Sequence, residues 1–186
     1  MNTRADSVRV AHPLFQAEGG GSTPTSALQL QVFGCPIRDA VRLNRKWHSR
    51  LPVLSNWQAC EAYSAEFEGV RYAVAIWSHP VARLLNGKGM WELRRMAIAP
   101  DAPRNTASRM LSVMSRLIRK ARPDIATLIS YQDTDVHKGT IYKASGWSPR
   151  LMSDSQTKWS MPNREREDGP ASNSPKVRWE LIIKPH

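Results

Sequence analysis

The sequence predicts a single α/β domain in which helices flank a mixed central β-sheet. Two observations lead to this prediction. Segments with the apolar pattern of strands alternate along the chain with segments of helical periodicity, an order typical of α/β folds. The chain has 186 residues, of which 41% are hydrophobic, which is enough for one compact core and short for two domains.

The first half of the chain predicts a strand, a helix and a hairpin. The sequence LQLQVFG at 28–34 is typical of a short strand. The segment 35–51 carries apolar residues on one helical stripe, and Pro52 is expected to end this helix. The sequence AYSAEFEGVRYAVAIWS at 62–78 indicates two strands joined by a tight turn at Glu68-Gly69.

The second half continues the alternation. MWELRRMAIAP at 90–100 is expected to form a strand that ends at its final proline. The segment 105–121 is the clearest amphipathic helix, because apolar residues occupy one face while arginine and lysine occupy the other. A strand at 124–132, a short helix at 137–146 and a last strand at 177–184 follow.

Two polar regions interrupt this pattern. Residues 1–27 contain GGGSTPTS and little apolar periodicity, which predicts a flexible N-terminal arm. Residues 28–186 are expected to form the folded domain. A polar excursion at 153–176, broken by proline and glycine, belongs to that domain, and excursions of this length are usually functional or disordered.

The charge of the chain predicts a polyanionic partner. Lysine and arginine number 27 against 16 acidic residues, a formal net charge of +11, and 19 of the 27 are arginine. Because the planar guanidinium matches phosphate oxygens, this excess favours nucleic acid, and a phosphorylated cofactor is the alternative. No apolar run is long enough for a membrane span, and no signal peptide is visible. Cys35 and Cys60 lack metal-ligand spacing and are expected to be reduced.

Several motifs resemble known families. A helix, a hairpin, a strand, a long helix, a strand and a short helix ending in an aromatic-glycine turn resemble the GNAT acyltransferase fold. LNRKWHSRLP, ELRRMAIAPDAPRNTASRM and SYQDTDVHKGTIYKASGW resemble the Mom family of phage DNA adenine-modification proteins, over roughly residues 28–150. This resemblance implies a transferase that adds a carbamoylmethyl group to adenine N6 in phage DNA, within the host cytoplasm, and so protects that DNA from restriction.

One turn departs from the GNAT pattern. Ordinary GNAT enzymes hold the pyrophosphate of acyl-CoA with a glycine-rich turn, where small residues let backbone N–H groups approach the phosphates at a helix N-terminus. The corresponding segment here, Arg104 to Arg109, contains no glycine, and Ser108 adds a hydroxyl. Acyl-CoA is therefore doubtful as the donor, and the sequence leaves the identity of the donor open.

The segment YQDTDVHKGTIYKASGW at 131–147 supplies two candidate catalytic residues. Joining a carbon to adenine N6 requires removal of a proton from the amine and stabilisation of the leaving group. Asp133 could accept that proton or orient the amine, and the alternative is an Asx turn or helix cap. Tyr142 could act as general acid, as a tyrosine in this region does in the GNAT fold, or could simply pack. Asp135 is the better cap candidate.

Ser108 and His48 complete the catalytic candidates. Ser108 could bond a phosphate or carbonyl of the donor, or could simply occupy the first helical turn. His48 could shuttle protons or bind a metal ion together with Asp133, and the alternative is a solvated histidine at a helix end. A metal ion is therefore a second candidate cofactor.

Basic residues are the candidate contacts to double-stranded DNA. Arg94 and Arg95 are adjacent on a predicted strand and are expected to point to opposite faces, with Arg95 preferred for the site and a Glu92 ion pair as the alternative. The other candidates lie on or beside two predicted helices: Arg38, Arg42, Arg45, Lys46 and Arg50 on the first, and Arg104, Arg109, Arg116 and Lys120 at the second.

A duplex substrate requires the target adenine to leave the base stack. Five tryptophans are expected mostly in the core, and any that lines the site could stack on the extruded base: Trp47, Trp57, Trp77, Trp91 and Trp147. The excursion at 153–176 is a candidate strand clamp.

Two other functions stay open: an acyltransferase that uses acyl-CoA on a small-molecule or protein amine, and a non-catalytic DNA-binding domain. A homodimer is also open.

Overall fold

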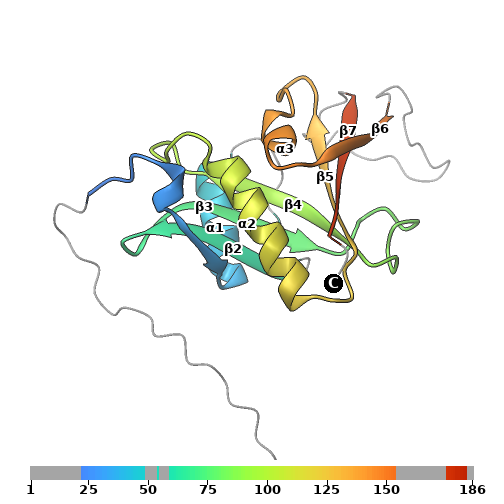
Figure 1. Cartoon of the computed structure of the whole chain (residues 1–186), viewed down its shortest axis with the longest axis horizontal. Helices are drawn as coiled ribbons and strands as arrows, with labels where there is room; N and C mark the ends of the chain where they lie inside the picture. The colour runs from blue at the N-terminus through green and yellow to red at the C-terminus, as the bar shows by residue number, and fades with distance from the viewer. Residues whose placement is uncertain (1–21, 49–53, 55–58, 154–174, 184–186) are drawn as a thin grey trace, which may run out of the picture.

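The computed structural model describes residues 22–48, 54, 59–153 and 175–183, and the side chains of 151–153 are not among them. Seven strands form one sheet in the order β1-β2-β3-β4-β5-β7-β6, in which only β4 and β5 are parallel (Figure 1). The predicted α/β fold with a mixed sheet is confirmed. The strands are β1 (Gln31–Gly34), β2 (Glu61–Phe67), β3 (Val70–Ser78), β4 (Met90–Ile98), β5 (Thr127–Asp133), β6 (Ser148–Ser153) and β7 (Lys176–Ile182).

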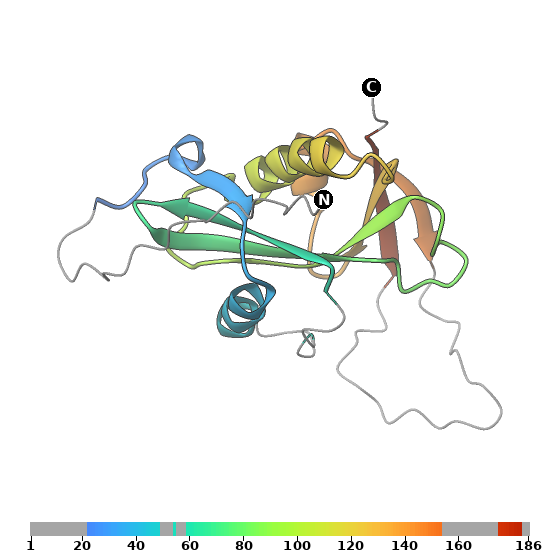
Figure 2. The same ribbon diagram turned by 90° about the horizontal axis from the view of Figure 1, so that it is seen from below.

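Helices lie on both faces of this sheet. Helix α1 (Ile37–Trp47) packs against β2, β3 and β4 on one side, which we call the α1 face. Helices α2 (Thr106–Ala121) and α3 (Thr140–Ala144) lie on the other side, the α2 face, as Figure 2 shows for α1 and α2. No helix within the described ranges is long and apolar enough to cross a membrane.

Each face of the sheet has its own hydrophobic core. The larger core, on the α2 face, contains the fully buried Trp77 and Trp91 together with Met110, Met114 and Trp147. The smaller core lies beneath α1 and is built from residues such as Ala40, Val41, Val74 and Ile76. The expectation that most tryptophans are core residues is confirmed for Trp77, Trp91 and Trp147, while Trp57 lies outside the described residues.

The hairpin and the long helix form where the sequence predicts them. Glu68 and Gly69 both have positive φ, as a two-residue turn between twisted strands requires. The first helix is shorter than expected, because it ends at Trp47 and His48 is already extended. Residues 49–53 lie outside the described residues, and so does the proposed stop at Pro52.

Two elements differ from the prediction. The segment expected as a strand at 28–34 begins with a 3₁₀ turn, η1 (Ala27–Gln29), in which Ser26 and Gln29 form a capping box. Strand β6 was not predicted, because SPRLMS is short and contains a proline; it lies at the sheet edge, where a missing N–H is tolerated. Of the predicted arm at 1–27, residues 1–21 lie outside the described residues, and so do residues 154–174 of the predicted excursion at 153–176. Within the described part of the arm, Ser22 Oγ donates to Glu68 Oε1 at 3.2 Å.

Candidate functional site

The sheet opens between its two parallel strands. β4 and β5 pair only from Met90 to Leu93 and from Thr127 to Ser130. Beyond these residues β4 continues to Ile98 and β5 to Asp133, and the two strands diverge (Figure 1). Beyond the last pair, Leu93 with Ser130, the two strands are no longer hydrogen-bonded to each other, and we call this splayed region the opening.

A bulge at this opening turns two arginines to the same side. In the β3–β4 pairing Trp77 opposes Leu93 and Ile76 opposes Arg95, so Arg94 is an extra residue. One extra residue shifts the alternation of side chains. Arg95 therefore shares the α1 face with its partner Ile76, and Arg94 shares it with Glu92. The prediction that the two arginines point to opposite faces is wrong for this reason.

Glu92 lies beside the two arginines on the α1 face and contacts Arg94. Its side chain is only 9% exposed, and it lies 3.4 Å from Arg94 Nε and accepts the Val81 N–H at 3.0 Å. Burial raises the pKa of Glu92, which the Val81 N–H and the two arginines partly offset. Burial and the adjacent Arg94 lower the pKa of Arg95, whose Nη1 donates to the Arg94 carbonyl at 2.7 Å. The Glu92 ion pair that was the alternative role for Arg94 is present.

The α1 face continues past the opening onto β5 and β7. Tyr131 follows the last paired residue of β5 and lies opposite Arg178 in the β5–β7 register. Trp179, the neighbour of Arg178, stacks on Tyr142 of α3, so Arg178 and Tyr131 point to the α1 face. Tyr131 is 39% exposed. In the described part of the chain α1 packs on β2, β3 and β4, so β5 and β7 carry no helix there.

A pocket on the α2 face lies at the N-terminus of α2. Its volume is about 270 Å³, and it is lined by Ile98, Pro103, Asn105, Thr106, Ala107, Ser108, Thr140, Ile141 and Ala144. Asn105 has a left-handed φ of 66° and its side chain does not cap the helix. The Thr106 N–H donates to the Pro103 carbonyl at 3.3 Å, and the next N–H groups of the first turn have no intrahelical acceptor. These N–H groups can receive an anion. The volume is at the lower end for small-molecule sites.

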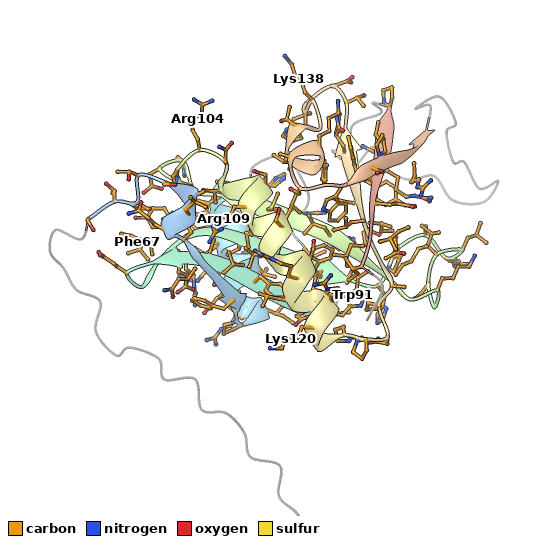
Figure 3. The ribbon with its side chains drawn as sticks, in the orientation of Figure 1. Phe67, Trp91, Arg104, Arg109, Lys120 and Lys138 are labelled. Atoms are coloured by element: carbon orange, nitrogen blue, oxygen red, sulfur yellow. The ribbon has the colours of Figure 1, made fainter. Side chains whose placement is uncertain are left out.

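The turn before α2 carries side chains where a glycine turn has none. Ser108 turns its hydroxyl back to the Asn105 carbonyl at 3.1 Å, and its side chain and that of Ala107 line the pocket. Figure 3 shows Arg104 and Lys138 extending outward from the two loops at this end of the molecule. The pocket therefore suits an anionic group with positive charge nearby, and it leaves less room for a pyrophosphate than a turn with glycine does.

Tyr142 lies in a buried cluster on the α2 face. Its hydroxyl is 2.9 Å from Ser130 Oγ, and its ring stacks on Trp179 at 5.3 Å and lies 5.7 Å from Trp147. Burial raises the pKa of Tyr142, and the Ser130 hydrogen bond opposes that rise. The phenol is therefore protonated at neutral pH, which suits a proton donor.

Asp133 is on strand β5, on the face opposite Ser130, the residue that bonds to Tyr142. It follows Tyr131 by two residues, so its side chain belongs to the α1 face, where Lys176 Nζ is 3.7 Å away. Its Oδ1 also accepts the backbone N–H of Asp135 at 3.1 Å. The Asx turn considered as an alternative is thus present. Asp135 does not cap α3, whose N-cap is Gly139.

The comparisons with known proteins agree with this geometry. A sequence model of the Mom protein family matches residues 29–176. The chain belongs to the Mom protein family. A search of the curated proteins gives no match.

Solved structures similar to this Mom-family chain are acetyltransferases. A putative GNAT-family acetyltransferase from Desulfovibrio desulfuricans has a TM-score of 0.59 at 11% identity, covering 83% of this chain and 99% of its own. The ribosomal-protein-S18-alanine N-acetyltransferase of Escherichia coli has a TM-score of 0.57 at 14% identity, and the match covers 83% of this chain and 94% of that one. A Bacillus subtilis acetyltransferase in complex with CoA has a TM-score of 0.54 at 10% identity, and the match covers 82% of this chain and 98% of that one. At these identities the likeness shows the fold, which is GNAT-like.

The Mom-family chain divides the predicted site residues between its two faces. Arg94, Arg95 and Asp133 lie on the α1 face, and Arg45, Lys46 and His48 lie on or at the end of α1 itself. Ser108 and Tyr142 lie on the α2 face, with Arg104 and Arg109 at the start of α2. Asp133 and Tyr142, predicted as a working pair, therefore approach the opening from opposite sides.

Several predicted residues have roles that the sequence does not reveal. Arg109 directs Nη2 to the carbonyls of Leu28 and Leu30, at 3.4 and 3.5 Å, and so joins α2 to the first turn of the fold. His48 occupies the C-cap of α1, where its N–H donates to the Asn44 carbonyl. Among the described residues no group of three histidine, cysteine or acidic side chains is arranged to hold a metal ion. The metal role of His48 and Asp133 stays a prediction.

Sequence reasoning missed Tyr131 and Arg178. They are far apart along the chain and only the β5–β7 pairing brings them together. The sole signal in the sequence is the alternation of VRWEL, which places Arg178 and Glu180 on the face opposite the aromatic Trp179.

Proposed function

We propose that this chain transfers a carbamoylmethyl-type group to the N6 amine of adenine in double-stranded DNA, within the cytoplasm of a phage-infected host. The observation that carries this proposal is the Mom-family match over residues 29–176. The modification would protect phage DNA from host restriction enzymes. The arrangement of the site supports a transfer reaction, because an opening in the sheet is approached by different residues from each face.

In this mechanism DNA binds to the α1 face and the donor binds to the α2 face. Exposed Arg45 and Lys46 contact phosphates, and Arg94 and Arg95 lie beside the opening. The donor places an anionic group at the N-terminus of α2, near Ser108. The target adenine leaves the stack because N6 is otherwise paired inside the duplex.

In the transfer, one bond forms and one breaks at the methylene carbon of the donor, and one proton moves at the adenine and another at the leaving group. A bond forms between adenine N6 and the methylene carbon of the donor, while the bond from that carbon to the leaving group breaks. N6 gives its proton to the Asp133 carboxylate, and Tyr142 gives a proton to the leaving group. The Tyr142 phenol is protonated at neutral pH and so has a proton to give, and the position of Asp133 on the DNA side supports the base role.

The proposal is tested by mass spectrometry of nucleosides. The protein is expressed in bacteria, plasmid DNA is digested, and deoxyadenosine is compared between the wild type and Asp133→Asn. We expect a heavier deoxyadenosine that is lost in Asp133→Asn, and its mass identifies the added group. Unmodified DNA from a folded wild-type protein, in cells that also supply the phage's other gene products, would contradict the proposal.

A second candidate is an acyltransferase that uses acyl-CoA on an amine. The pocket at the N-terminus of α2 favours it, because that position binds phosphate groups well. Titration calorimetry with acetyl-CoA distinguishes the two. We expect weak or absent binding because Ala107 and Ser108 narrow the turn, and micromolar binding would favour the acyltransferase. A DNA-binding domain without chemistry would instead bind DNA and leave deoxyadenosine unchanged.

A further inference from the structure

The α1 face holds an exposed tyrosine among several arginines. Arg178 lies directly opposite Tyr131 in the β5–β7 pairing, so the two side chains are neighbours on the same face of the sheet. Glu180, 12% exposed, lies 2.8 Å from Arg178 Nη2 and 3.5 Å from Arg150 Nε. The Glu180 carboxylate therefore holds both guanidinium groups in place, and it keeps Arg178 beside Tyr131.

The charges on this part of the α1 face do not cancel. Four guanidinium groups, of Arg94, Arg95, Arg150 and Arg178, accompany two carboxylates, Glu92 and Glu180, which leaves an excess of two positive charges. Lys176 and Asp133 form a further pair without net charge. An anionic partner would offset this excess, and phosphate oxygens match the planar guanidinium.

Tyr131 offers a planar surface at the position where a base would arrive. It follows Ser130, the last residue of β5 that pairs with β4, so it lies at the edge of the opening. Trp77, Trp91 and Trp147, which the sequence offered for stacking, are buried and cannot perform this role. A base that leaves the duplex loses its stacking neighbours, and an aromatic side chain replaces them.

We propose that Tyr131 is the stacking platform for the extruded adenine, with the neighbouring arginines of the α1 face supplying positive charge. This assignment rests on the proposed function and adds a residue to its DNA-binding side. The alternative is that Tyr131 only covers the sheet. Stacking requires an aromatic ring but no hydroxyl, so the two roles predict different effects of substitution.

The test compares three variants of Tyr131 with a matched control. Phe33, on the edge strand β1, is 41% exposed, close to the 39% of Tyr131, so Phe33→Ala removes an equally exposed aromatic ring far from the opening. Binding of a single-stranded oligonucleotide that contains 2-aminopurine, whose fluorescence is quenched by stacking, is measured. In parallel, modified deoxyadenosine is quantified in plasmid DNA.

We expect Tyr131→Ala to weaken oligonucleotide binding about tenfold, to abolish the quenching and to lower modification by a similar factor. Tyr131→Phe and Tyr131→Trp should retain the quenching, and Phe33→Ala should behave as the wild type. Circular dichroism confirms that each variant is folded.

Equal quenching and modification by Tyr131→Ala and the wild type would overturn the assignment and leave the proposed function intact. Quenching that depends on Tyr131, without any heavier deoxyadenosine from the wild type, would support a base-binding platform while contradicting the proposed function. The two hypotheses therefore fail separately.

Discussion

Among the described glycines, Gly139 tolerates an added side chain least. Its φ is +71°, and an added Cβ would lie 2.5 Å from Gln132 Oε1 and 2.6 Å from the Trp179 ring. These two neighbours are hydrogen-bonded to each other at 2.7 Å, so neither moves easily. Gly139 thus fixes how closely α3 approaches the sheet.

We expect Gly139→Ala to lower the free energy of unfolding by about 2–4 kcal/mol, combining backbone strain with overpacking. Gly87→Ala is the control, since φ is +75° there but no atom lies within 4 Å of the added Cβ. The control should lose only about 1–2 kcal/mol. Urea unfolding measures both variants. Equal losses would show that the Gln132 and Trp179 side chains move aside without lowering the free energy of unfolding.

Tyr142 and Ser130 allow packing to be separated from chemistry. Both side chains are buried and share one hydrogen bond, so removing either hydroxyl should cost about 1 kcal/mol of stability. If Tyr142 is the general acid, Tyr142→Phe should lower adenine modification by about a hundredfold or more, whereas Ser130→Ala should lower it less than tenfold. Nucleoside mass spectrometry measures both. Similar small effects would indicate that Tyr142 only packs.

At the scale of elements, the two long helices carry basic residues on opposite sides of the sheet. Arg42 and Arg45 are exposed on α1, and Arg116 and Lys120 are exposed on α2. The sequence suggested both helices as DNA-binding surfaces. The position of Arg94, Arg95 and Asp133 on the α1 face favours α1.

We expect the double variant Arg42→Ala, Arg45→Ala to weaken binding to duplex DNA and to reduce the slope of log affinity against log salt by about two. The matched variant Arg116→Ala, Lys120→Ala should leave that slope unchanged. Fluorescence anisotropy over a series of salt concentrations measures both. A larger effect from the α2 variant would place the DNA on the other face.

At the scale of the whole molecule, burial of ionisable groups predicts sensitivity to alkaline pH. Burial raises the pKa of Tyr63, Tyr72 and Tyr142, and it raises the pKa of the Cys35 thiol to about 11. The folded protein therefore holds these protons more tightly than the unfolded chain does. Their contribution to stability is complete below the unfolded-state pKa values and is lost as the pH rises through the folded-state values.

We expect the free energy of unfolding to fall from about pH 9, where the thiol of the unfolded chain ionises, and more steeply above about pH 10, where its phenols do. Urea unfolding at successive pH values measures this decline. Tyr63→Phe removes one titrating group and should make the decline shallower. A free energy that stays constant to about pH 11 would contradict the assigned burial of these groups.

The elements themselves follow from local sequence. The hairpin at 62–78 and the helix at 105–121 were predicted, because apolar periodicity and turn residues act within a few residues of one another. The same local rules failed for η1, where Ser26 and Gln29 cap a turn, and for β6, whose short edge position needs no strong strand signal. The Mom-family motifs also lie in local sequence, so the family could be predicted without a structure.

The site, in contrast, was decided by pairing between distant strands. Arg94 and Arg95 share a face because β4 has one residue more than β3 between two pairs. Asp133 and Tyr142 are separated because Asp133 lies on the α1 face of β5, whereas Tyr142 of α3 bonds to Ser130 on the α2 face of that strand. Tyr131 meets Arg178 only through the β5–β7 register. The sequence by itself determined most of the elements, the fold class and the family. The tertiary structure alone decided which side chains meet, because side-chain direction depends on hydrogen-bonding register between strands that are distant along the chain.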